Sequence, residues 1–458
     1  MSQWIETELA ENQMHDRRHA KRLAHLLERL SEQTVSSIPR ACHGWAETIA
    51  AYRFLDNARV GLKEILSGHQ QATLERLQAQ EVVLLVQDTT FLNYGTLRPK
   101  TGVGTVKDRT REEYLLHLTV AFTPERVNLG VLGLRMWQRP DEPVAQERAR
   151  KPIEEKESYR WLESYQLACE VQQRCSTTLV VNIADREGDI QECFLEAMSR
   201  EAADRAEFII RAKCNRRLTT GHDQGYLWPE MQRTPPLGHL TVKVTRQRER
   251  APRQATLTVA TRRVSFTGAR RRGGRLPPVE VTVLYAQERR PPKGEKPIEW
   301  LLLTSLPVED FSSACTVVQW YGDRWEIEVF FRVLKQGCRI EQLRLQTKPR
   351  LVNALAVYLI VAWRIHTITM LSRAYPAVGC EVVFEPQEWQ TIYMMHSRRR
   401  PPQESPPLRE IVRCLARLGG FLARTGDGEP GVQTLWQGYQ RLYDFLYALE
   451  THQAVTAS

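Results

Sequence analysis

The sequence predicts an α/β protein with a mixed-sheet core and an antiparallel β insertion, flanked by a helical domain at each end. Short continuous apolar runs, EVVLLVQ (81–87) and TTLVVNIA (177–184), are typical of strands buried on both faces. Alternating apolar and polar residues between about 214 and 300 predict antiparallel hairpins. Leucines and aromatic residues at helical spacing dominate both ends of the chain.

The N-terminal part is expected to be a small basic helical domain, residues 1–68. Its segment 14–30 repeats leucine at helical spacing and carries Arg17, Arg18, Lys21 and Arg22 on the polar side. The central domain is expected to span 69–373, with the insertion at about 214–300, and a helical C-terminal domain to span 374–458.

The central domain is predicted from strands, hairpins and two helices. After the run at 81–87, strands are expected at 114–122, 127–137, 177–184 and 207–213, with a helix before the last. Hairpin strands are expected at 239–246, 255–264 and 279–286, with turns at 268–274 and 289–297, followed by a strand at 299–305. Helices are expected near 312–336 and 350–373.

The C-terminal part begins with a connector and continues with two helices. Segment 396–407 is rich in proline and charge, and helical patterns cover 409–421 and 435–450. Aromatic residues and leucines share one face of the last helix, which fits either core packing or a partner helix.

Composition limits the classes of protein. A chain of 458 residues exceeds one hydrophobic core, and 42% hydrophobic with 26% charged residues indicates a folded globular protein. A formal net charge of +10 favours an acidic partner. Nine scattered cysteines without a C-x-x-C pair, and an N-terminus without an export signal, predict a cytoplasmic protein. The most apolar stretch, 354–363, is too short to span a membrane, so we expect a core helix and no membrane partner.

Three acidic residues are candidates for metal chemistry. Asp88 and Asp185 follow apolar strand-like runs, where a sheet displays reactive side chains, although such aspartates also cap turns and helices. Tyr321, Arg324, Glu328 and Lys335 fall within roughly a 60° arc of one ideal helix face, whereas Glu326 is directed away from it. An ordinary solvated surface would give the same pattern. Three converging carboxylates would repel one another unless they held divalent cations, and hard oxygen ligands suit Mg²⁺ or Mn²⁺.

At these residues the sequence resembles the insertion-sequence transposases of family four, the hairpin-forming DDE transposases, and most closely their Tn-five branch. The resemblance is carried, in the family's order, by YRFLDN (52–57), VQDTTFLNYG (87–95), RPDEP (139–143), ADREGDI (184–190), PPKGEKPIEWLLLTSLPV (291–308), YGDRWEIEVFFRVLKQG (321–337) and ARLGGF (416–421).

The resemblance implies a fold and a set of site residues. Asp88, Asp185 and Glu328 match the family's DDE triad on a ribonuclease-H-like core and would hold Mg²⁺, with Mn²⁺ as a substitute and two ions in a site. The residues that match the family's DNA contacts are Arg18, Arg22, Arg53, Arg211, Trp300, Tyr321, Arg324 and Lys335, with Trp300 matching the tryptophan that stacks on a flipped base. His19 departs from the family because it stands where a DNA-contacting arginine is found.

The resemblance also implies cut-and-paste DNA transposition. The partners would be double-stranded DNA, as terminal inverted repeats and as target, and a second copy of the chain in a synaptic complex, in a bacterial cytoplasm at the nucleoid. Two alternatives stay open: a DNA-binding relative that does not cut, and a metal-dependent nuclease that cuts but does not join.

Overall fold

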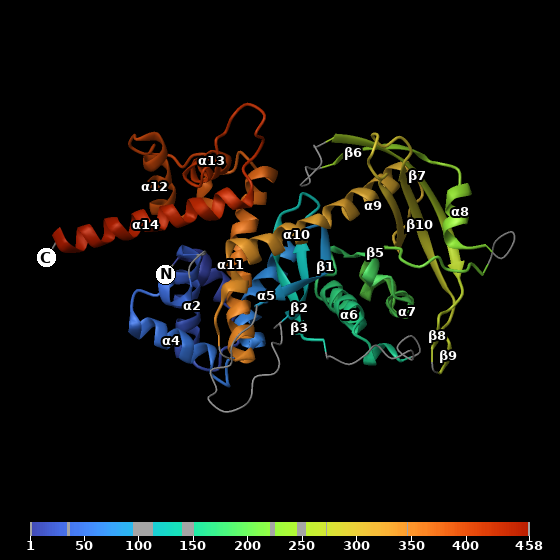
Figure 1. Cartoon of the computed structure of the whole chain (residues 1–458), viewed down its shortest axis with the longest axis horizontal. Helices are drawn as coiled ribbons and strands as arrows, with labels where there is room; N and C mark the ends of the chain where they lie inside the picture. Colours follow the sequence, from blue (N-terminus) through green and yellow to red (C-terminus); the bar gives the residue numbers. More distant parts are fainter. Residues whose placement is uncertain are drawn as a thin grey trace.

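The structure, a computed structural model, describes residues 2–33, 37–94, 113–139, 151–219, 225–244, 253–271, 273–345 and 347–456. It confirms the α/β class: a large mixed sheet runs through the molecule, with the N- and C-terminal helical parts and both termini at one end and the strands of the β insertion at the other (Figure 1). Gly95 and residues 140–143 of the motifs quoted above lie outside the described residues.

The sheet has nine strands in the order β3-β2-β1-β4-β5-β11-β10-β7-β6. Its first strands are β1 (Val82–Asn93), β2 (Glu113–Phe122), β3 (Asn128–Trp137), β4 (Leu179–Ala184) and β5 (Glu207–Arg211). The pairs β1–β4 and β4–β5 are parallel, and the other neighbours are antiparallel. Each of these strands was predicted from its apolar run.

The insertion continues this sheet. Its strands are β6 (Gly238–Val244), β7 (Arg253–Phe266) and β10 (Val279–Glu288), and β11 (Glu299–Thr304) joins them to the core by pairing with β5. The hairpins confirm the alternating pattern, and the predicted turn at 268–274 carries the two-residue strands β8 (Arg270–Arg271) and β9 (Gly274–Arg275). A short helix, α8 (Leu227–Arg233), was not predicted.

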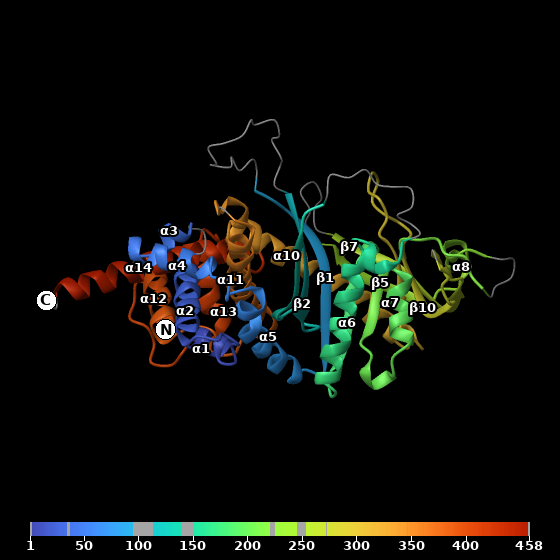
Figure 2. The same ribbon diagram turned by 90° about the horizontal axis from the view of Figure 1, so that it is seen from below.

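Helices cover both faces of the central strands (Figure 2). Helices α6 (Tyr159–Arg174) and α7 (Gln191–Met198) cover one face, and α5 (Leu62–Gln78) and α11 (Lys348–Ala374) cover the other. Alternate residues of β1 enter two separate cores: Val83 and Leu85 pack with α6 and α7, and Leu84 and Val86 pack with α11. Burial on both faces explains why the strand is apolar throughout.

Helix α11 is long and apolar enough to cross a membrane. However, 89% of its most apolar window is buried inside the protein, because it packs against the sheet, α5 and the N-terminal helices. Burial within protein is the property expected of a core helix.

The helix predicted near 312–336 is not one straight helix. The structure has α9 (Phe311–Asp323), a break at Arg324, α10 (Trp325–Arg332) and a π-helical turn, Val333–Gly337. Helix α9 starts where predicted because Asp310 caps it: Oδ1 of Asp310 accepts the N–H of Ser313 at 2.8 Å.

The N-terminal region is helical, as expected. It contains α1 (Gln3–Leu9), α2 (Arg17–Glu32), α3 (Ile38–Ala41), α4 (Trp45–Leu55) and α5. Residue 68, the predicted boundary between the first two domains, lies inside α5. A buried group fastens α1 to α5: the Glu8 carboxylate accepts hydrogen bonds from His69 Nδ1 at 2.6 Å and Arg76 Nη1 at 2.5 Å.

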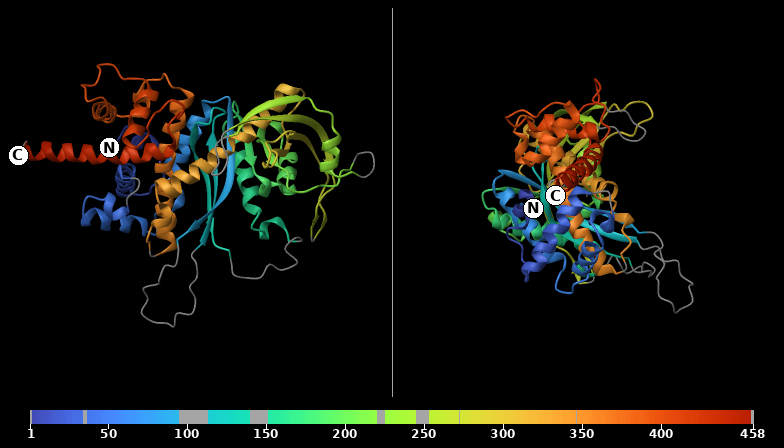
Figure 3. Two further views of the ribbon diagram at one scale, coloured as in Figure 1. Left: turned by 45° about the horizontal axis from the view of Figure 1, so that its top comes forward. Right: turned by 90° about the vertical axis from the view of Figure 1, so that its left-hand side faces the viewer.

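The C-terminal region contains α12 (Pro386–Ser397), α13 (Leu408–Leu418) and α14 (Val432–Thr456). Helix α12 was not predicted. Helices α13 and α14 approach closely at two glycines, because a Cβ at Gly419 would lie 1.8 Å from the carbonyl oxygen of Thr434, and one at Gly438 would lie 2.1 Å from that of Leu415. The C-terminal part of α14 projects beyond the rest of the molecule (Figure 3).

Candidate active site

Asp88 lies at the point where two strands separate. The parallel pairing of β1 with β4 ends at Val86 and Ile183, and β1 continues to Asn93 paired with β2. The expectation that the strand ends before Asp88 is therefore wrong; Asp88 lies within β1. Its Oδ1 accepts the backbone N–H of Thr89 at 2.7 Å, which holds the side chain at this edge.

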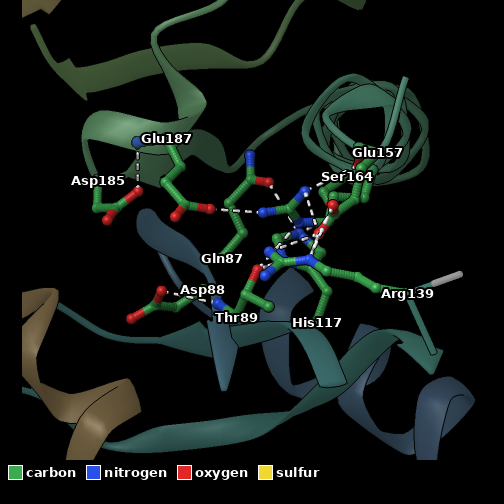
Figure 4. Close-up of polar contacts among 10 residues, drawn as sticks. Gln87, Asp88, Thr89, His117, Arg139, Glu157, Ser164, Asp185 and Glu187 are labelled. Atoms are coloured by element: carbon green, nitrogen blue, oxygen red, sulfur yellow. Dashed lines mark hydrogen bonds and ion pairs between the residues drawn. The ribbon is translucent and has the colours of Figure 1, made fainter. Parts of the chain in front are cut away.

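Asp185 follows β4 directly, as predicted. It caps a 3-10 turn at 186–188, and its Oδ1 accepts the backbone N–H of Glu187 at 2.7 Å. The capping interaction anticipated for strand-end aspartates is therefore present here, and it also fixes the side chain. Figure 4 shows the Asp88 and Asp185 carboxylates facing a common space from β1 and from the turn after β4.

Glu328 is connected to Asp88 by Arg324. One guanidinium nitrogen of Arg324, Nη1, donates to Oδ2 of Asp88 at 2.9 Å, and the other, Nη2, donates to Oε1 of Glu328 at 2.6 Å. Arg324 lies at the break between α9 and α10, and Glu328 lies one turn further along α10. One cation therefore bridges carboxylates that are 240 residues apart in the sequence.

The pKa of Asp88 reflects all three acids. Burial raises it to about 6, Arg324 opposes that rise, and the negative charges of Asp185 and Glu328 add to it. Asp185 and Glu328 therefore each lie close enough to Asp88 to act on it electrostatically.

The three acids supply oxygen atoms of the kind that a divalent metal ion binds. Carboxylate oxygens are hard ligands that suit Mg²⁺ and Mn²⁺. Within the described residues, however, no group of three acidic, histidine or cysteine side chains is close enough to hold a metal ion as it stands. The guanidinium of Arg324 lies between two of the acids and supplies the positive charge there.

Tyr321, the first residue of the predicted polar stripe, lies close to the acids. Tyr321 is buried beside Trp300, with ring centroids 5.4 Å apart, and burial raises the pKa of Tyr321 while Arg324 and Arg211 lower it. Arg211, on β5, donates to the carbonyl oxygen of Glu299 at 2.8 Å. These residues gather around the acids.

Lys335 lies in the π-helical turn, Val333–Gly337, that follows α10. Burial lowers the pKa of Lys335, and the neighbouring negative charge is that of Glu341.

Glu326 is directed away from the acids, as predicted. It is 7% exposed and lies 3.5 Å from Nε2 of His366, a fully buried residue of α11. Nearby, Nε of Arg126 donates to Oδ1 of Asp323 at 2.6 Å. These residues form a second polar cluster, which stabilises the helix break on the side that faces away from the acids.

Comparison with protein families agrees with the residues described above. Residues 1–60 match the model described as Transposase DNA-binding, residues 197–364 match Transposase DDE domain, and residues 360–454 match Transposase Tn5 dimerisation domain.

The chain belongs to the Tn5-like transposases of the IS4 family. The transposase is accordingly a DNA-binding, divalent-metal-dependent nuclease and strand transferase that dimerises. The matched DDE segment includes Glu328. The dimerisation match includes the stretch 374–410, which resembled the family poorly at the level of sequence motifs.

The three N-terminal arginines of the predicted DNA contacts lie at the surface or partly at it. Arg18 and Arg53 are exposed and Arg22 is half-buried, and within the described part of the chain their side chains form no ion pair. His19 instead has an internal partner, since its Nε2 lies 3.1 Å from Nδ2 of Asn57. The departure of His19 from the family is thus accompanied by a structural role.

Sequence reasoning missed Arg160. This buried arginine of α6 donates from Nε to Oγ1 of Thr89 at 3.0 Å and from Nη2 to Oε2 of Glu187 at 2.5 Å. Thr89 and Glu187 are the residues whose N–H groups bind Asp88 and Asp185, so Arg160 connects the supports of both aspartates. The sequence held little signal for it, because Arg160 is one of several polar or charged residues within 159–174.

Proposed function

We propose that Asp88, Asp185 and Glu328 form the catalytic triad of a cut-and-paste transposase. The observation that carries the proposal is the convergence of the three acids: Arg324 bridges Asp88 and Glu328, and Asp185 acts on the pKa of Asp88. The substrate is DNA bearing the transposon's terminal inverted repeats. The protein would act in the bacterial cytoplasm, associated with the nucleoid.

The triad would hold two Mg²⁺ ions, with Mn²⁺ as a substitute. Such ions supply activation of the attacking oxygen and stabilisation of the leaving oxygen of the phosphodiester. Asp88 and Asp185 are already oriented for this role by backbone N–H groups. Arg324 would exchange its carboxylate partners for a DNA phosphate, which offers the same fork of acceptor oxygens.

The remaining residues of the site would orient the DNA. Tyr321, Arg211 and Lys335 would contact phosphates beside the cut, and Arg18, Arg22 and Arg53 would bind the inverted repeat. Trp300 lies half-buried against Tyr321, so one ring face could receive a base turned out of the duplex during hairpin formation.

The reaction proposed is a series of phosphoryl transfers at one site. Water attacks one strand, the freed 3′-hydroxyl attacks the opposite strand to form a hairpin, water opens the hairpin, and the 3′-end joins target DNA. Two copies of the chain would pair two ends, each site acting on the end held mainly by the partner.

The test uses the full-length protein, Mg²⁺ and a duplex carrying the inverted repeat that flanks the coding region. Nicks, hairpins and joined products are expected from the unaltered protein. Asp185→Ala should abolish all three and retain DNA binding, whereas Asp204→Ala, at an exposed aspartate, should change none of them. Cutting without any joined product would instead indicate a nuclease.

A second pair of variants tests the role of Trp300. Trp300→Ala should retain the first nick and lose the hairpin, and Trp300→Phe should restore hairpin formation because it keeps an aromatic face. Equal loss of nicking and hairpin formation in both variants would show that the residue does not act on the flipped base.

A further inference from the structure

A buried histidine lies beside the strand that carries Asp88 and has no part in the proposed chemistry. His117 interrupts the apolar run 115–118 of β2 and is 3% exposed. In the β1–β2 ladder it lies directly opposite Thr89, the residue whose backbone N–H binds Oδ1 of Asp88. A polar ring in a buried strand needs hydrogen-bond partners for its nitrogens.

Both ring nitrogens of His117 have such partners (Figure 4). Nδ1 lies 2.9 Å from Oγ1 of Thr89, and Nε2 lies 3.2 Å from Oε1 of Gln87 and 3.1 Å from Oγ of Ser164. The ring also packs edge-on against Trp161, with ring centroids 4.7 Å apart. These contacts hold the imidazole in one orientation.

The partners of this ring determine which nitrogen carries the proton. Nε of Arg160 donates to Oγ1 of Thr89 at 3.0 Å, so this hydroxyl already accepts one hydrogen bond and has its own proton to donate. Nδ1 of His117 is the acceptor that receives it. At the other end, Nε2 of Gln87 donates to Oδ1 of Asn182 at 2.8 Å, which leaves the Gln87 carbonyl oxygen as an acceptor for the ring. Both ends therefore select the neutral ring with its proton on Nε2.

A second proton on the ring would break this arrangement. A charged ring would direct an N–H from Nδ1 at the Thr89 hydroxyl, which already accepts from a guanidinium. Burial lowers the pKa of His117 well below its ordinary value, and the positive charges of Arg160 and Arg135 add to that effect. The ring is therefore neutral at neutral pH.

The Thr89 hydroxyl is thus held from two sides, by a donor and by an acceptor. Two hydrogen bonds leave this β-branched side chain a single orientation, and its backbone lies in the β1–β2 ladder. The same residue donates its N–H to Asp88 at 2.7 Å. A shift of Thr89 would therefore shift the Asp88 carboxylate.

We propose that His117 is a positioning residue for Asp88: its unprotonated Nδ1 accepts the Thr89 hydroxyl and keeps the Thr89 N–H aligned with Oδ1 of Asp88. The proposal rests on the proposed function, since Asp88 matters for catalysis only if it belongs to the triad. In this assignment His117 touches neither DNA nor the reacting atoms and acts through Thr89. Removal of partners that orient metal-binding side chains typically changes activity by about 10- to 100-fold.

Two amide substitutions separate the roles of the two ring nitrogens. The amide of His117→Asn falls where Nδ1 lies and offers Thr89 an acceptor oxygen, whereas that of His117→Gln falls near Nε2 and leaves the Thr89 hydroxyl without this acceptor. Both variants remove a buried aromatic ring, so both lose packing. Thr119→Val is the control, because it removes a buried hydrogen bond to Ser164 from the same strand and leaves the contact between His117 and Thr89 in place.

Three quantities are measured on the full-length protein: affinity for an end duplex in EDTA, the single-turnover rate of nicking in Mg²⁺ at saturating DNA, and hydrogen exchange of the Thr89 N–H in EDTA. His117→Gln is expected to bind DNA like the unaltered protein, to nick about 10- to 100-fold more slowly and to exchange the Thr89 N–H faster. His117→Asn should recover most of the rate and of the protection. Thr119→Val should match the unaltered protein in all three quantities.

Equal nicking rates in the two His117 variants overturn the proposal. A slower rate without faster exchange at Thr89 also overturns it, and so does faster exchange without a slower rate. If the unaltered protein fails to nick DNA in Mg²⁺, the proposed function fails. The exchange comparison in EDTA then still decides, because equal protection of the Thr89 N–H in His117→Gln and His117→Asn would show that Nδ1 does not hold Thr89.

Discussion

Nη1 of Arg324 lies 2.9 Å from Oδ2 of Asp88. Its positive charge offsets the negative charges of Asp185 and Glu328, which also act on Asp88. The same guanidinium reaches Glu328, so it substitutes electrostatically for the cation that three carboxylates require. Both terminal nitrogens of the Arg324 guanidinium are thus directed at carboxylates of the site.

Removal of this arginine should make stability depend on divalent cations. Arg324→Ala leaves Asp88 and Glu328 without a counter-charge, and we expect a loss of about 2 kcal/mol of unfolding free energy in EDTA. Millimolar Mg²⁺ should restore more stability to the variant than to the unaltered protein, as measured by thermal unfolding. Arg332→Ala, at an exposed position on the same helix, is the control. An equal effect of Mg²⁺ on all three proteins would contradict the prediction.

Asp323 should make stability fall as pH rises. Burial raises its pKa to about 6 despite Arg126, so the folded protein holds this proton more tightly than the unfolded chain does. No penalty exists below the unfolded pKa of about 4, and a penalty of roughly 3 kcal/mol develops as pH rises to about 6. Asp323→Asn cannot ionise, so its stability relative to the unaltered protein should improve between pH 4.5 and pH 7. Asp204→Asn, at an exposed aspartate, is the control; a difference that does not change with pH would refute the assignment.

Glu8 should control attachment of the first helix. Its carboxylate accepts hydrogen bonds from His69 and Arg76. Burial favours a higher pKa for Glu8, but the contacts with His69 and Arg76 outweigh it, so the pKa lies below the ordinary value. Glu8→Gln should cost about 2–4 kcal/mol, because the substitution removes charge from a buried, hydrogen-bonded group. Urea unfolding and faster proteolysis after α1 would reveal the loss. Glu6→Gln, exposed on the same helix, should match the unaltered protein.

Gly438 should be required for the close packing of α13 against α14 in the dimerisation domain. A Cβ at this position would meet the Leu415 carbonyl oxygen at 2.1 Å, so Gly438→Ala must separate α13 from α14. We expect a loss of at least about 2 kcal/mol from strain and lost packing, together with weaker assembly of two-ended complexes in sedimentation. Gly431→Ala meets no atom within 4 Å and is the matched control. Indistinguishable behaviour of the two variants would show that the helices can separate without cost.

The elements of this fold were predictable where burial leaves a local pattern. β1 and β4 are apolar throughout because both faces are covered, and the hairpins alternate because one face is exposed. The end of β1 was misplaced because the residues after Val86 become polar while the backbone stays paired with β2. Strand pairing beyond an apolar run depends on a neighbour that is distant in the sequence.

The candidate site was predictable in its acids and less so in their surroundings. Asp185 and Glu328 lie at the ends or faces of elements, which a pattern can locate. Arg160 was missed because its role depends on contacts with β1 and with the turn after β4, far away in the chain. The π-helical turn at Lys335 was not predicted, because nothing in the residue spacing indicates a wider helical turn there.

The pairing of β11 with β5 has a consequence for the order of events on the DNA. Trp300 lies on β11, and Asp185 directly follows β4. Both strands belong to one hydrogen-bonded sheet, in which only β5 lies between them. Such a sheet can twist slightly but cannot slide its strands apart without breaking their ladders. In the reaction proposed above, Trp300 and Asp185 would therefore keep their positions relative to each other, and the DNA would move between steps.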